Sequence, residues 1–393
     1  MKDVVIIADF CSAFDGKGNN RFVYIAENLL KKDFQVEIVT SDFFHSDKKY
    51  FNPIIKDYKG LKVTMLHEPA YQKNVSIKRF LAHYKWGKEV GKYLKNRKKP
   101  DVVYCAIPTL KAASVAGKYC NKYGIKFIVD IQDLWPEAFK MVFNVPIISS
   151  ILFWPFKILV NKAYRRADEI VGVSQTYVNR ALKVSKKVKE GHSVFLGTDI
   201  EKFDRNVEFG QKLKKDKHEI WLGYCGSLGT SYDLSFVFAA MRKCNNPNLK
   251  FIIMGCGPKE ADFRNNSLDL NVVFLGRLPY SDMCSVLNQC DIVVNPIKSK
   301  SAASIINKHA DYAASGRPVL NTQNSEEYMK LVELYQMGFN VNDDLNFFSE
   351  KMNLLCVDDS LRNNMGKNSR RCAMDLFDRK KSYNAIFDLF FYD

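Results

Sequence analysis

Several features that define other classes of protein are missing from this sequence. None of the ten cysteines forms a Cys-x-x-Cys pair, which favours reduced, buried thiols over a disulfide framework. The longest apolar segment, Ile147 to Val160, contains Pro155 and Lys157 and is shorter than the ~20 residues of a membrane-spanning helix. The apolar stretch from Val4 to Ala8 is too short for a signal-peptide core. These absences predict a cytoplasmic chain, at most peripheral to a membrane.

Signals for metal and for nucleic acid are also scarce. The six histidines have no zinc-ligand spacing, and no Asp-x-Asp occurs, so we expect no metal cofactor. The formal net charge is +16, which predicts an anionic partner: nucleic acid, a phosphorylated ligand or an acidic membrane surface. No zinc-finger, RNA-recognition or helix-turn-helix pattern is visible, which disfavours nucleic acid.

Short β-branched runs recur along the chain with helical stretches between them. Most are continuously apolar, which is typical of strands buried on both faces of a parallel sheet. The 393 residues suffice for two or three domains. The runs lie at residues 3–8, 36–40, 63–66, 101–104, 126–129, 169–173 and 193–196 in the first half, and at 220–224, 250–254, 272–275, 291–294 and 318–320 in the second.

This rhythm is interrupted once, which indicates two α/β domains in tandem. A polar, lysine-rich stretch at 206–218 is the predicted linker. It separates a first domain, 1–205, from a second, 219–375. The amphipathic segment 376–393 is expected to form a C-terminal helix that packs back on either domain, with the N-terminal domain as the first candidate.

Ligands bind beyond the carboxyl ends of parallel strands, so the loops at these ends are candidate sites. After the first strand, Gly18 and Asn19 could present backbone amides to an anion at a helix start; a flexible turn is the alternative. Asp133 follows the fifth strand and is either a helix cap or a carboxylate in a cleft.

In the second half, three strand ends carry glycine-containing loops, beginning at Gly226, Gly255 and Gly276. Glycine costs backbone entropy, so we expect a ligand to approach the backbone closely there.

A dense segment of potential ligand groups follows the strand at 291–294. Ser301 or Ser304 could cap a helix that ends at Gly316, with free amides at its start. Lys308 and Asp311 lie three residues apart and so share a face. They present a cation and a hydroxyl-binding carboxylate, although an ordinary surface pair would look the same.

The order of these loops resembles glycosyltransferase family 4 of the GT-B superfamily. Residues 307–319 are similar to the family signature Lys-x-x-(Glu/Asp)-Tyr-x-Ala-x-Gly-x-Pro, and 133–137, 196–199, 255–258 and 274–277 resemble further family blocks. Within the family the likeness is to bacterial enzymes that build capsular or O-antigen polysaccharide. It implies a GT-B fold: two Rossmann-like parallel-sheet domains that face a cleft.

The resemblance also implies roles for single residues. Asp311 would bind the ribose hydroxyls, and Gly276 with Arg277 would hold the base of a nucleotide sugar, for which UDP is expected. Lys308 and the amides from Ser304 to Asn307 would hold the diphosphate. The remaining donor-binding candidates are Gly18, Asn19, Gly226, Ser227, Lys298 and Ile305.

The chain departs from the family pattern at several positions. The first of two family glutamates falls on Ala303, and the family's diphosphate-binding Arg and Lys are replaced by Ser227 and by Ser231 or Tyr232. Lys298 or Lys308 would then supply the charge. The family's His-Asp pair appears as Gln132-Asp133.

The implied reaction is sugar transfer with retention at the anomeric carbon, with Lys308 and Asp133 as the catalytic candidates. Lys308 would stabilise the departing diphosphate, and Asp133 would balance the oxocarbenium-like sugar. A sugar-nucleotide 2-epimerase of the same architecture is the nearest alternative. A non-enzymatic nucleic-acid- or membrane-binding protein is a more distant one.

The segment from residue 71 to residue 99 interleaves aromatic residues with many cations and is the predicted acceptor side. Such a helix suits an anionic membrane surface, where a polyprenyl-diphosphate-linked or saccharide acceptor would be reached; a solvated helix face is the alternative. The candidates here are Lys73, Asn74, Lys78, Arg79 and His83.

Overall fold

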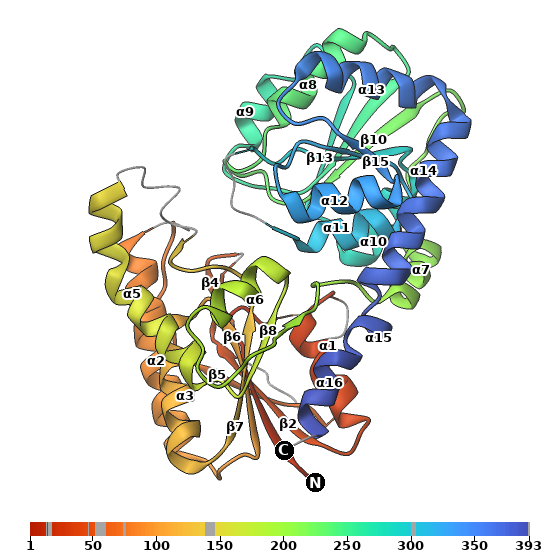
Figure 1. Cartoon of the computed structure of the whole chain (residues 1–393). Helices are drawn as coiled ribbons and strands as arrows, with labels where there is room; N and C mark the ends of the chain where they lie inside the picture. Colours follow the sequence, from red (N-terminus) through yellow and green to blue (C-terminus); the bar gives the residue numbers. More distant parts are fainter. Residues whose placement is uncertain are drawn as a thin grey trace. The chain divides into compact units, whose positions relative to one another are not determined.

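The computed structural model describes residues 1–12, 14, 18–45, 47–51, 60–73, 76–137, 146–299 and 304–391, without side chains for 146–152 (Figure 1). The chain divides into two compact units. The first comprises Met1–Val194 with Tyr383–Asp393, and the second comprises Phe195–Ser382.

These units differ from the boundaries that the sequence suggested. The segment 206–218, predicted as a linker, lies inside the second unit. Its first residues complete helix α7 (Ile200–Phe209). Further on, the Leu213 backbone donates to Gln289 Oε1 at 2.9 Å and accepts from Gln289 Nε2 at 2.8 Å. The polar, lysine-rich composition therefore reflects a surface segment that is hydrogen-bonded to the second unit.

The first unit is built on a parallel sheet with the strand order β5-β2-β1-β6-β7-β8-β9. Its continuous apolar runs are buried on both faces, as expected for a sheet covered by helices. A separate antiparallel pair, β3 (Phe43–Phe44) and β4 (Lys49–Tyr50), was not predicted. The sheet strands are β1 (Asp3–Ile7), β2 (Gln35–Ser41), β5 (Lys62–Leu66), β6 (Val102–Ile107), β7 (Lys126–Ile131), β8 (Glu169–Gly172) and β9 (His192–Ser193).

Helices cover both faces of this sheet (Figure 1). On one face lie α1 (Arg21–Leu30) and the C-terminal α16 (Asn384–Phe391); on the other lie α2 (Ile77–Asn96), α3 (Leu110–Tyr123) and α5 (Pro146–Arg166), while α6 (Gln175–Leu182) follows β8.

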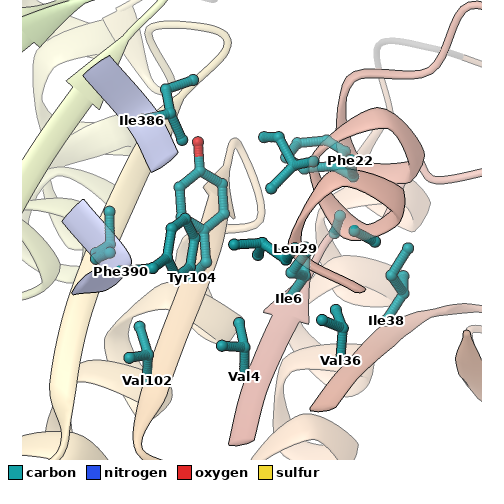
Figure 2. Packing of buried hydrophobic residues seen from close by; sticks show 14 of the residues in the cluster. Val4, Ile6, Phe22, Leu29, Val36, Ile38, Val102, Tyr104, Ile386 and Phe390 are labelled. Carbon is teal, nitrogen blue, oxygen red and sulfur yellow. The ribbon is translucent and has the colours of Figure 1, made fainter. Parts of the chain in front are cut away.

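Figure 2 shows the core between the sheet and helices α1 and α16. Ile386 and Phe390 of α16 lie beside Tyr104 of β6, and Phe22 and Leu29 come from α1. The end of the predicted C-terminal segment therefore packs on the first unit.

A buried ion pair connects α1 to the sheet. Arg21 donates from Nε to Asp130 Oδ2 at 2.8 Å and from Nη2 to Asp130 Oδ1 at 3.3 Å. Tyr104 Oη also donates to this carboxylate, and Arg21 Nη1 reaches Tyr383 Oη at 3.0 Å. Asp130, one of the carboxylates at the end of its strand, thus has a structural role.

The second unit has a parallel sheet with the order β12-β11-β10-β13-β14-β15. Alternate strand residues enter two separate cores: Trp221, Cys225 and Val293 face one, and Leu222 and Tyr224 face the other. Its strands are β10 (Ile220–Cys225), β11 (Leu249–Met254), β12 (Val272–Gly276), β13 (Ile292–Asn295), β14 (Val319–Asn321) and β15 (Gly338–Asn340).

Each of these cores is closed by its own helices. The first is covered by α7, α10 (Tyr280–Gln289), α11 (Asn307–Ala314), α12 (Glu326–Tyr335), α14 (Asp359–Cys372) and the π-helix Ala373–Phe377, which α15 (Arg379–Ser382) follows. The second is covered by α8 (Leu234–Cys244), α9 (Glu260–Asn265) and α13 (Leu345–Val357). Two parallel-sheet α/β units confirm that part of the predicted fold class.

Two expectations on membranes and thiols can be compared with this fold. Among the described residues, no helix combines the length and the hydrophobicity that crossing a bilayer requires. All ten cysteines are free thiols; most are buried as predicted, but Cys244 is half-buried and Cys256 is exposed.

Candidate functional site

The strand order of the second sheet reverses at β10, which pairs with β11 on one side and β13 on the other. In open α/β sheets this switch point, beyond the carboxyl ends of the strands, is where ligands bind. The loop after β10 begins with Gly226, and the loop after β13 leads into α11. The candidate donor site is therefore built from these two loops and the first turns of α11.

Helix α11 begins later than predicted. Its N-cap is Ile306, whose backbone N–H donates to His309 Nδ1 at 3.2 Å. Ser304 does not cap the helix, because its hydroxyl donates to Glu327 Oε2 at 2.9 Å, and Ser301 lies outside the described residues. The Ile306 amide is thus already engaged by His309 rather than available to a diphosphate.

Lys308 lies in an aromatic cage. Its side chain is 8% exposed, and Nζ lies 4.4 Å from the ring centroid of Tyr224 and 3.8 Å from that of Tyr232. Nζ also donates to Tyr224 Oη at 3.2 Å, and that hydroxyl donates onward to the Ser227 carbonyl at 2.7 Å. Gly226 leaves room for the ammonium, since a Cβ there would lie 2.5 Å from Nζ.

The charge of Lys308 is poorly compensated. Within the described residues it makes no ion pair with a carboxylate, so burial lowers its pKa to about 7. The alternative of a surface Lys–Asp pair is wrong, because both Lys308 and Asp311 are buried. A cation that is desolvated without a counter-ion is a ready site for an anionic ligand.

Asp311 lies one turn further along α11 and has different partners. Its Oδ1 accepts from Tyr280 Oη at 2.8 Å, and Thr198 Oγ1 lies 2.9 Å from that same hydroxyl. Burial raises the pKa of Asp311 to about 6, while the hydrogen bond from Tyr280 opposes this rise. The carboxylate is therefore held in a fixed orientation and titrates just below neutral pH.

The glycines at the strand ends have a structural explanation that differs from the predicted one. A Cβ on Gly255 would overlap the carbonyl oxygen of Gly226, and one on Gly257 would lie 2.5 Å from the Leu228 oxygen. These two glycines are thus required because neighbouring loops pack backbone against backbone. At Gly276, where φ is +67°, nothing lies within 4 Å of a Cβ, which leaves open space beside the backbone.

The other predicted donor-binding residues are divided between surface and interior. Ser227, Arg277, Lys298 and Asn307 are exposed. Ser304 and Ile305 are buried, and Ile305 belongs to the hydrophobic core, so its side chain does not face a ligand. Gly18 and Asn19 belong to the first unit, where they precede Asn20, the N-cap of α1.

Titratable side chains also lie close together at the carboxyl ends of the strands in the first unit. Asp9 follows β1, Glu68 follows β5, and His83 of α2 lies 3.9 Å from Asp9 Oδ2 and 3.8 Å from Glu68 Oε1 through Nε2. The His83 ring stacks on Trp135 with centroids 5.2 Å apart. Of these residues the sequence singled out His83; Asp9 and Glu68 were missed.

Asp133 lies next to this group. Its Oδ2 accepts from Trp135 Nε1 at 3.0 Å, and burial raises its pKa while the charge of Arg79 acts in the opposite direction. The side chain caps no described helix. Both predicted roles, a helix cap and a carboxylate in a cleft, therefore stay predictions.

The predicted acceptor-side residues on α2 point in two directions. Lys73 and Lys78 are exposed, and Asn74 lies outside the described residues. Arg79 and His83 instead turn inward: the Arg79 guanidinium lies 4.5 Å from the Trp135 ring centroid, and His83 is buried. His83 therefore belongs to the interior of the first unit, and half-buried Arg79 lies against it.

The outer face of α2 keeps the mixed character that the sequence indicated. Exposed apolar side chains and lysines alternate along it, whereas Arg97 is removed from it by ion pairs with Asp3 and Glu37. A largely apolar pocket of about 20 Å³ lies between α2 and α5 beside His83 and Trp135, room for a water-sized group only. The exposed residues of this face are Ile77, Lys78, Leu81, Tyr84, Lys85, Lys88, Lys92 and Lys95.

Tyr224, Tyr232 and Tyr280 complete the donor site, and sequence reasoning assigned none of them a ligand-site role. Tyr224 ends a strand run and Tyr280 begins a helix, so both look like ordinary core residues. A usable signal was present only for Tyr232, which stands in the region where the resembling family has a cation.

Comparisons with known proteins agree with this geometry. Residues 219–358 match the family model described as Glycosyl transferases group 1. No curated protein sequence matches the chain.

Solved structures match over nearly the whole chain. Sucrose-phosphate synthase from Thermosynechococcus elongatus is 14% identical with a TM-score of 0.75, and the match covers 99% of this chain and 98% of that one. Anabaena Alr3699/HepE in complex with UDP is 17% identical with a TM-score of 0.69, covering 99% of both chains. A Listeria monocytogenes protein described as a UDP-N-acetylglucosamine 2-epimerase is 11% identical with a lower TM-score of 0.62, covering 98% and 94%.

At these identities the structural matches establish the fold, and the family match locates the group 1 segment in the second unit. The chain has the GT-B fold, and the match of its residues 219–358 to the glycosyl transferases group 1 model supports a glycosyltransferase.

Proposed function

We propose that the chain is a retaining glycosyltransferase of family 4 that uses a nucleoside-diphosphate sugar with UDP as the nucleotide. The acceptor is a lipid-linked or saccharide chain, and the product is a surface polysaccharide of the capsule or O-antigen type. The main observation behind this proposal is Lys308, a buried ammonium without a carboxylate partner among the described residues, at the switch point of the second sheet.

A diphosphate is the ligand that best fits this ammonium. Sugar transfer leaves a nucleoside diphosphate with developing negative charge, and preorganised donors aimed at such charge are worth about 2.7–4 kcal/mol each. Lys308 is held in place by Tyr224 and Tyr232, so little reorganisation is needed when the charge develops. Exposed Lys298, in the loop after β13, can add a second cation.

The remaining parts of the donor follow from the neighbours of Lys308. Asp311, oriented by Tyr280, would accept hydrogen bonds from the ribose hydroxyls. The open space beside Gly276 suits the flat face of a base next to Arg277. Uridine is favoured because HepE, which shares the fold, was solved with UDP.

The sugar would become oxocarbenium-like at the transition state, and Asp133 is the candidate to balance that charge. No metal is proposed at the diphosphate, because the sequence contains no Asp-x-Asp. Binding of UDP-glucose is accordingly expected to persist unchanged in EDTA; a requirement for Mg²⁺ or Mn²⁺ in that binding would contradict this part of the proposal.

The acceptor side is assigned to the first unit. The outer face of α2 combines exposed Ile77 and Leu81 with several lysines, and each lysine near an anionic leaflet contributes about 1 kcal/mol. We expect the protein to co-sediment with vesicles that contain phosphatidylglycerol at low salt, and Lys78→Gln/Lys85→Gln to weaken this. Equal sedimentation with neutral vesicles would argue against a membrane-side acceptor.

Ligand binding tests the donor assignment directly. In isothermal titration calorimetry we expect UDP and UDP-glucose to bind, and Lys308→Met to lose most of that affinity. Lys330→Met is the matched control, because Lys330 is an exposed lysine of the same unit that pairs with Glu326. Unaltered binding by Lys308→Met would remove the lysine from the site, and tight binding of a DNA oligonucleotide in place of UDP would favour the nucleic-acid alternative.

Product analysis separates the transferase from the epimerase. A transferase needs an acceptor and releases UDP, and NMR of the product would reveal the same anomeric configuration as in the donor. An epimerase converts UDP-N-acetylglucosamine to its 2-epimer with no acceptor present. Conversion without an acceptor would therefore overturn the transferase assignment, and inversion at the anomeric carbon would overturn retention.

A further inference from the structure

The group of Asp9, Glu68 and His83 in the first unit has no role in the donor chemistry described above. Asp9 is 5% exposed, Glu68 1% and His83 5%. Asp9 follows β1 and Glu68 follows β5, the two strands on either side of β2, and His83 lies on α2. Burial of two carboxyl groups side by side is costly unless something compensates their charge.

The compensation within the described residues is incomplete. Neither oxygen of Asp9 has a hydrogen-bond partner, and Glu68 Oε1 and His83 Nδ1 also lack one. Among the other polar atoms of the group, Glu68 Oε2 accepts from the Ser41 hydroxyl at 2.8 Å and His83 Nε2 accepts from Arg79 Nε at 3.4 Å. Unpaired buried acceptors of this kind are rare in native proteins and indicate a missing partner.

The ligand atoms converge on one point. His83 Nε2 lies 3.9 Å from Asp9 Oδ2 and 3.8 Å from Glu68 Oε1, and one ligand atom from each residue lies within 4.8 Å of the others. Distances of this size between ligand atoms are compatible with nitrogen and oxygen ligands placed around one divalent cation.

Positive groups also face the cluster, and they limit what can bind. Arg79 Nε donates to His83 Nε2 at 3.4 Å, and Lys48 Nζ lies 3.2 Å from His45 Nδ1 nearby. The Arg79 guanidinium is held over the rings of Phe10, Tyr71 and Trp135, and its contact with His83 is long for a hydrogen bond. This contact also shows that the lone pair of Nε2, the atom a cation would need, points into the cluster.

We propose that Asp9, Glu68 and His83 form a binding site for one first-row divalent cation, such as Mn²⁺ or Zn²⁺. One imidazole nitrogen and two carboxylate oxygens form a mixed donor set that favours these ions over Ca²⁺ and Mg²⁺, which prefer oxygen alone. The cation would displace the Arg79 contact from His83 and fasten α2 to the ends of β1 and β5. Sequence spacing gives no sign of such a site because its ligands are scattered over three segments.

The proposal is independent of the donor assignment, so it can be tested without measuring activity. The full-length, tag-free chain is stripped with EDTA, dialysed, and titrated with Mn²⁺ and with Zn²⁺ in separate experiments, with equilibrium dialysis and elemental analysis as the readout. We expect one tightly bound cation per chain for at least one of the two ions, and a higher melting temperature in its presence, because only the folded chain holds the three ligands together.

Isosteric variants identify the ligands. Asp9→Asn and Glu68→Gln each keep the side-chain volume and remove a buried charge, so the metal-free fold should be at least as stable, as checked by melting in EDTA. Each is expected to weaken cation binding by about tenfold or more. His67→Gln is the matched control, since His67 is an exposed histidine of the same unit beside Asp42 and should bind as the wild type does.

Two results would overturn the site. The first is a wild-type chain that binds neither ion up to millimolar concentration. The second is binding that survives unchanged in Asp9→Asn and Glu68→Gln, or that is lost equally in His67→Gln, because the cation would then be held elsewhere.

Discussion

The buried ammonium of Lys308 makes nucleotide-sugar binding depend on pH in a way that can be calculated. In the free chain its pKa is lowered to about 7, with burial as the main cause. A bound diphosphate places opposite charge beside it and raises that pKa. Binding above neutral pH must therefore be accompanied by uptake of a proton, and affinity falls as pH rises.

The size of the effect follows from the shift. Each pH unit above 7 costs about tenfold in affinity, or 1.36 kcal/mol, as long as the pKa in the complex stays above the working pH. Between pH 6 and pH 9 the dissociation constant of UDP-glucose should rise about 100-fold, about 2.7 kcal/mol. UDP-glucose is the suitable probe because its diphosphate, unlike that of UDP, has no ionisation near neutral pH.

Calorimetry in buffers of different ionisation enthalpy measures the proton directly. At pH 8 we expect uptake of about 0.9 proton per UDP-glucose bound. Lys308→Met should bind weakly and without pH dependence over the same range. A flat profile in the wild-type protein, or proton release, would refute the conclusion that the Lys308 amine is largely unprotonated at pH 8 before the ligand binds.

The same variant has a second consequence, for stability. The pKa of Lys308 is lower in the folded chain than the value of about 10.4 in an unfolded one, so the unfolded chain binds more protons between these pH values and the free energy of unfolding rises with pH there. Lys308→Met removes the free-energy cost of burying this amine. It should raise the free energy of unfolding by about 4–5 kcal/mol near pH 6 and by about 2 kcal/mol at pH 9, as measured by urea denaturation.

Three further predictions concern other parts of the chain. Asp311→Asn should weaken UDP-glucose binding about 10- to 100-fold. It should also abolish the loss of affinity expected of the wild type below pH 6, where this carboxyl becomes protonated; a titration series from pH 5 to 7 checks both. Gly255→Ala should destabilise the second unit by about 3 kcal/mol or more, because the new Cβ overlaps a neighbouring carbonyl. Gly276→Ala should lower the free energy of unfolding by only about 1–2 kcal/mol, through left-handed backbone strain. Thermal unfolding of the two variants compares these effects. Asp130→Ala should cost about 3–5 kcal/mol because it leaves the Arg21 guanidinium buried and unpaired, and an unchanged melting temperature would contradict that role.

The fold could be predicted because most of its strands are recognisable as apolar runs in the sequence. Runs such as those that became β1, β6 and β11 are apolar throughout, and this is decisive for a parallel sheet covered on both faces. β15 (Gly338–Asn340) was missed because it is three residues long and contains a glycine and an asparagine. Its position is fixed by pairing with β14, which is tertiary information that no local pattern carries.

The site could be predicted only in part, for a related reason. Lys308 and Asp311 are found by their spacing in a signature, but the side chains that hold them come from elsewhere in the chain. The start of α11 was misplaced because Ser304 has the composition of an N-cap, while its hydroxyl is taken by Glu327. Local sequence offers such capping residues, and tertiary partners decide which of them are used.

Glu68 illustrates the limit of this reasoning most sharply. It lies two residues beyond an ordinary strand run and has no motif around it, yet the fold brings it to Asp9 and His83. The three residues are separated by long stretches of chain, so only the pairing of β1, β2 and β5 places them together. A chemically informative cluster can thus arise from residues that are individually unremarkable in sequence.

The two candidate sites share one physical feature, which net charge could not have revealed. Most of the excess positive charge is carried by exposed lysines, whose interactions are screened by water and salt. At Lys308 and at Asp9, by contrast, a charge is desolvated without an adequate partner, and the resulting penalty opposes folding of the free chain. A ligand of opposite charge removes that penalty and adds its own attraction, so affinity is concentrated where the fold is locally least stable. If this reasoning is correct, the neutral isosteres at both positions should stabilise the free chain while they weaken binding, and this opposite pair of effects distinguishes a binding site from a charge that merely supports the fold.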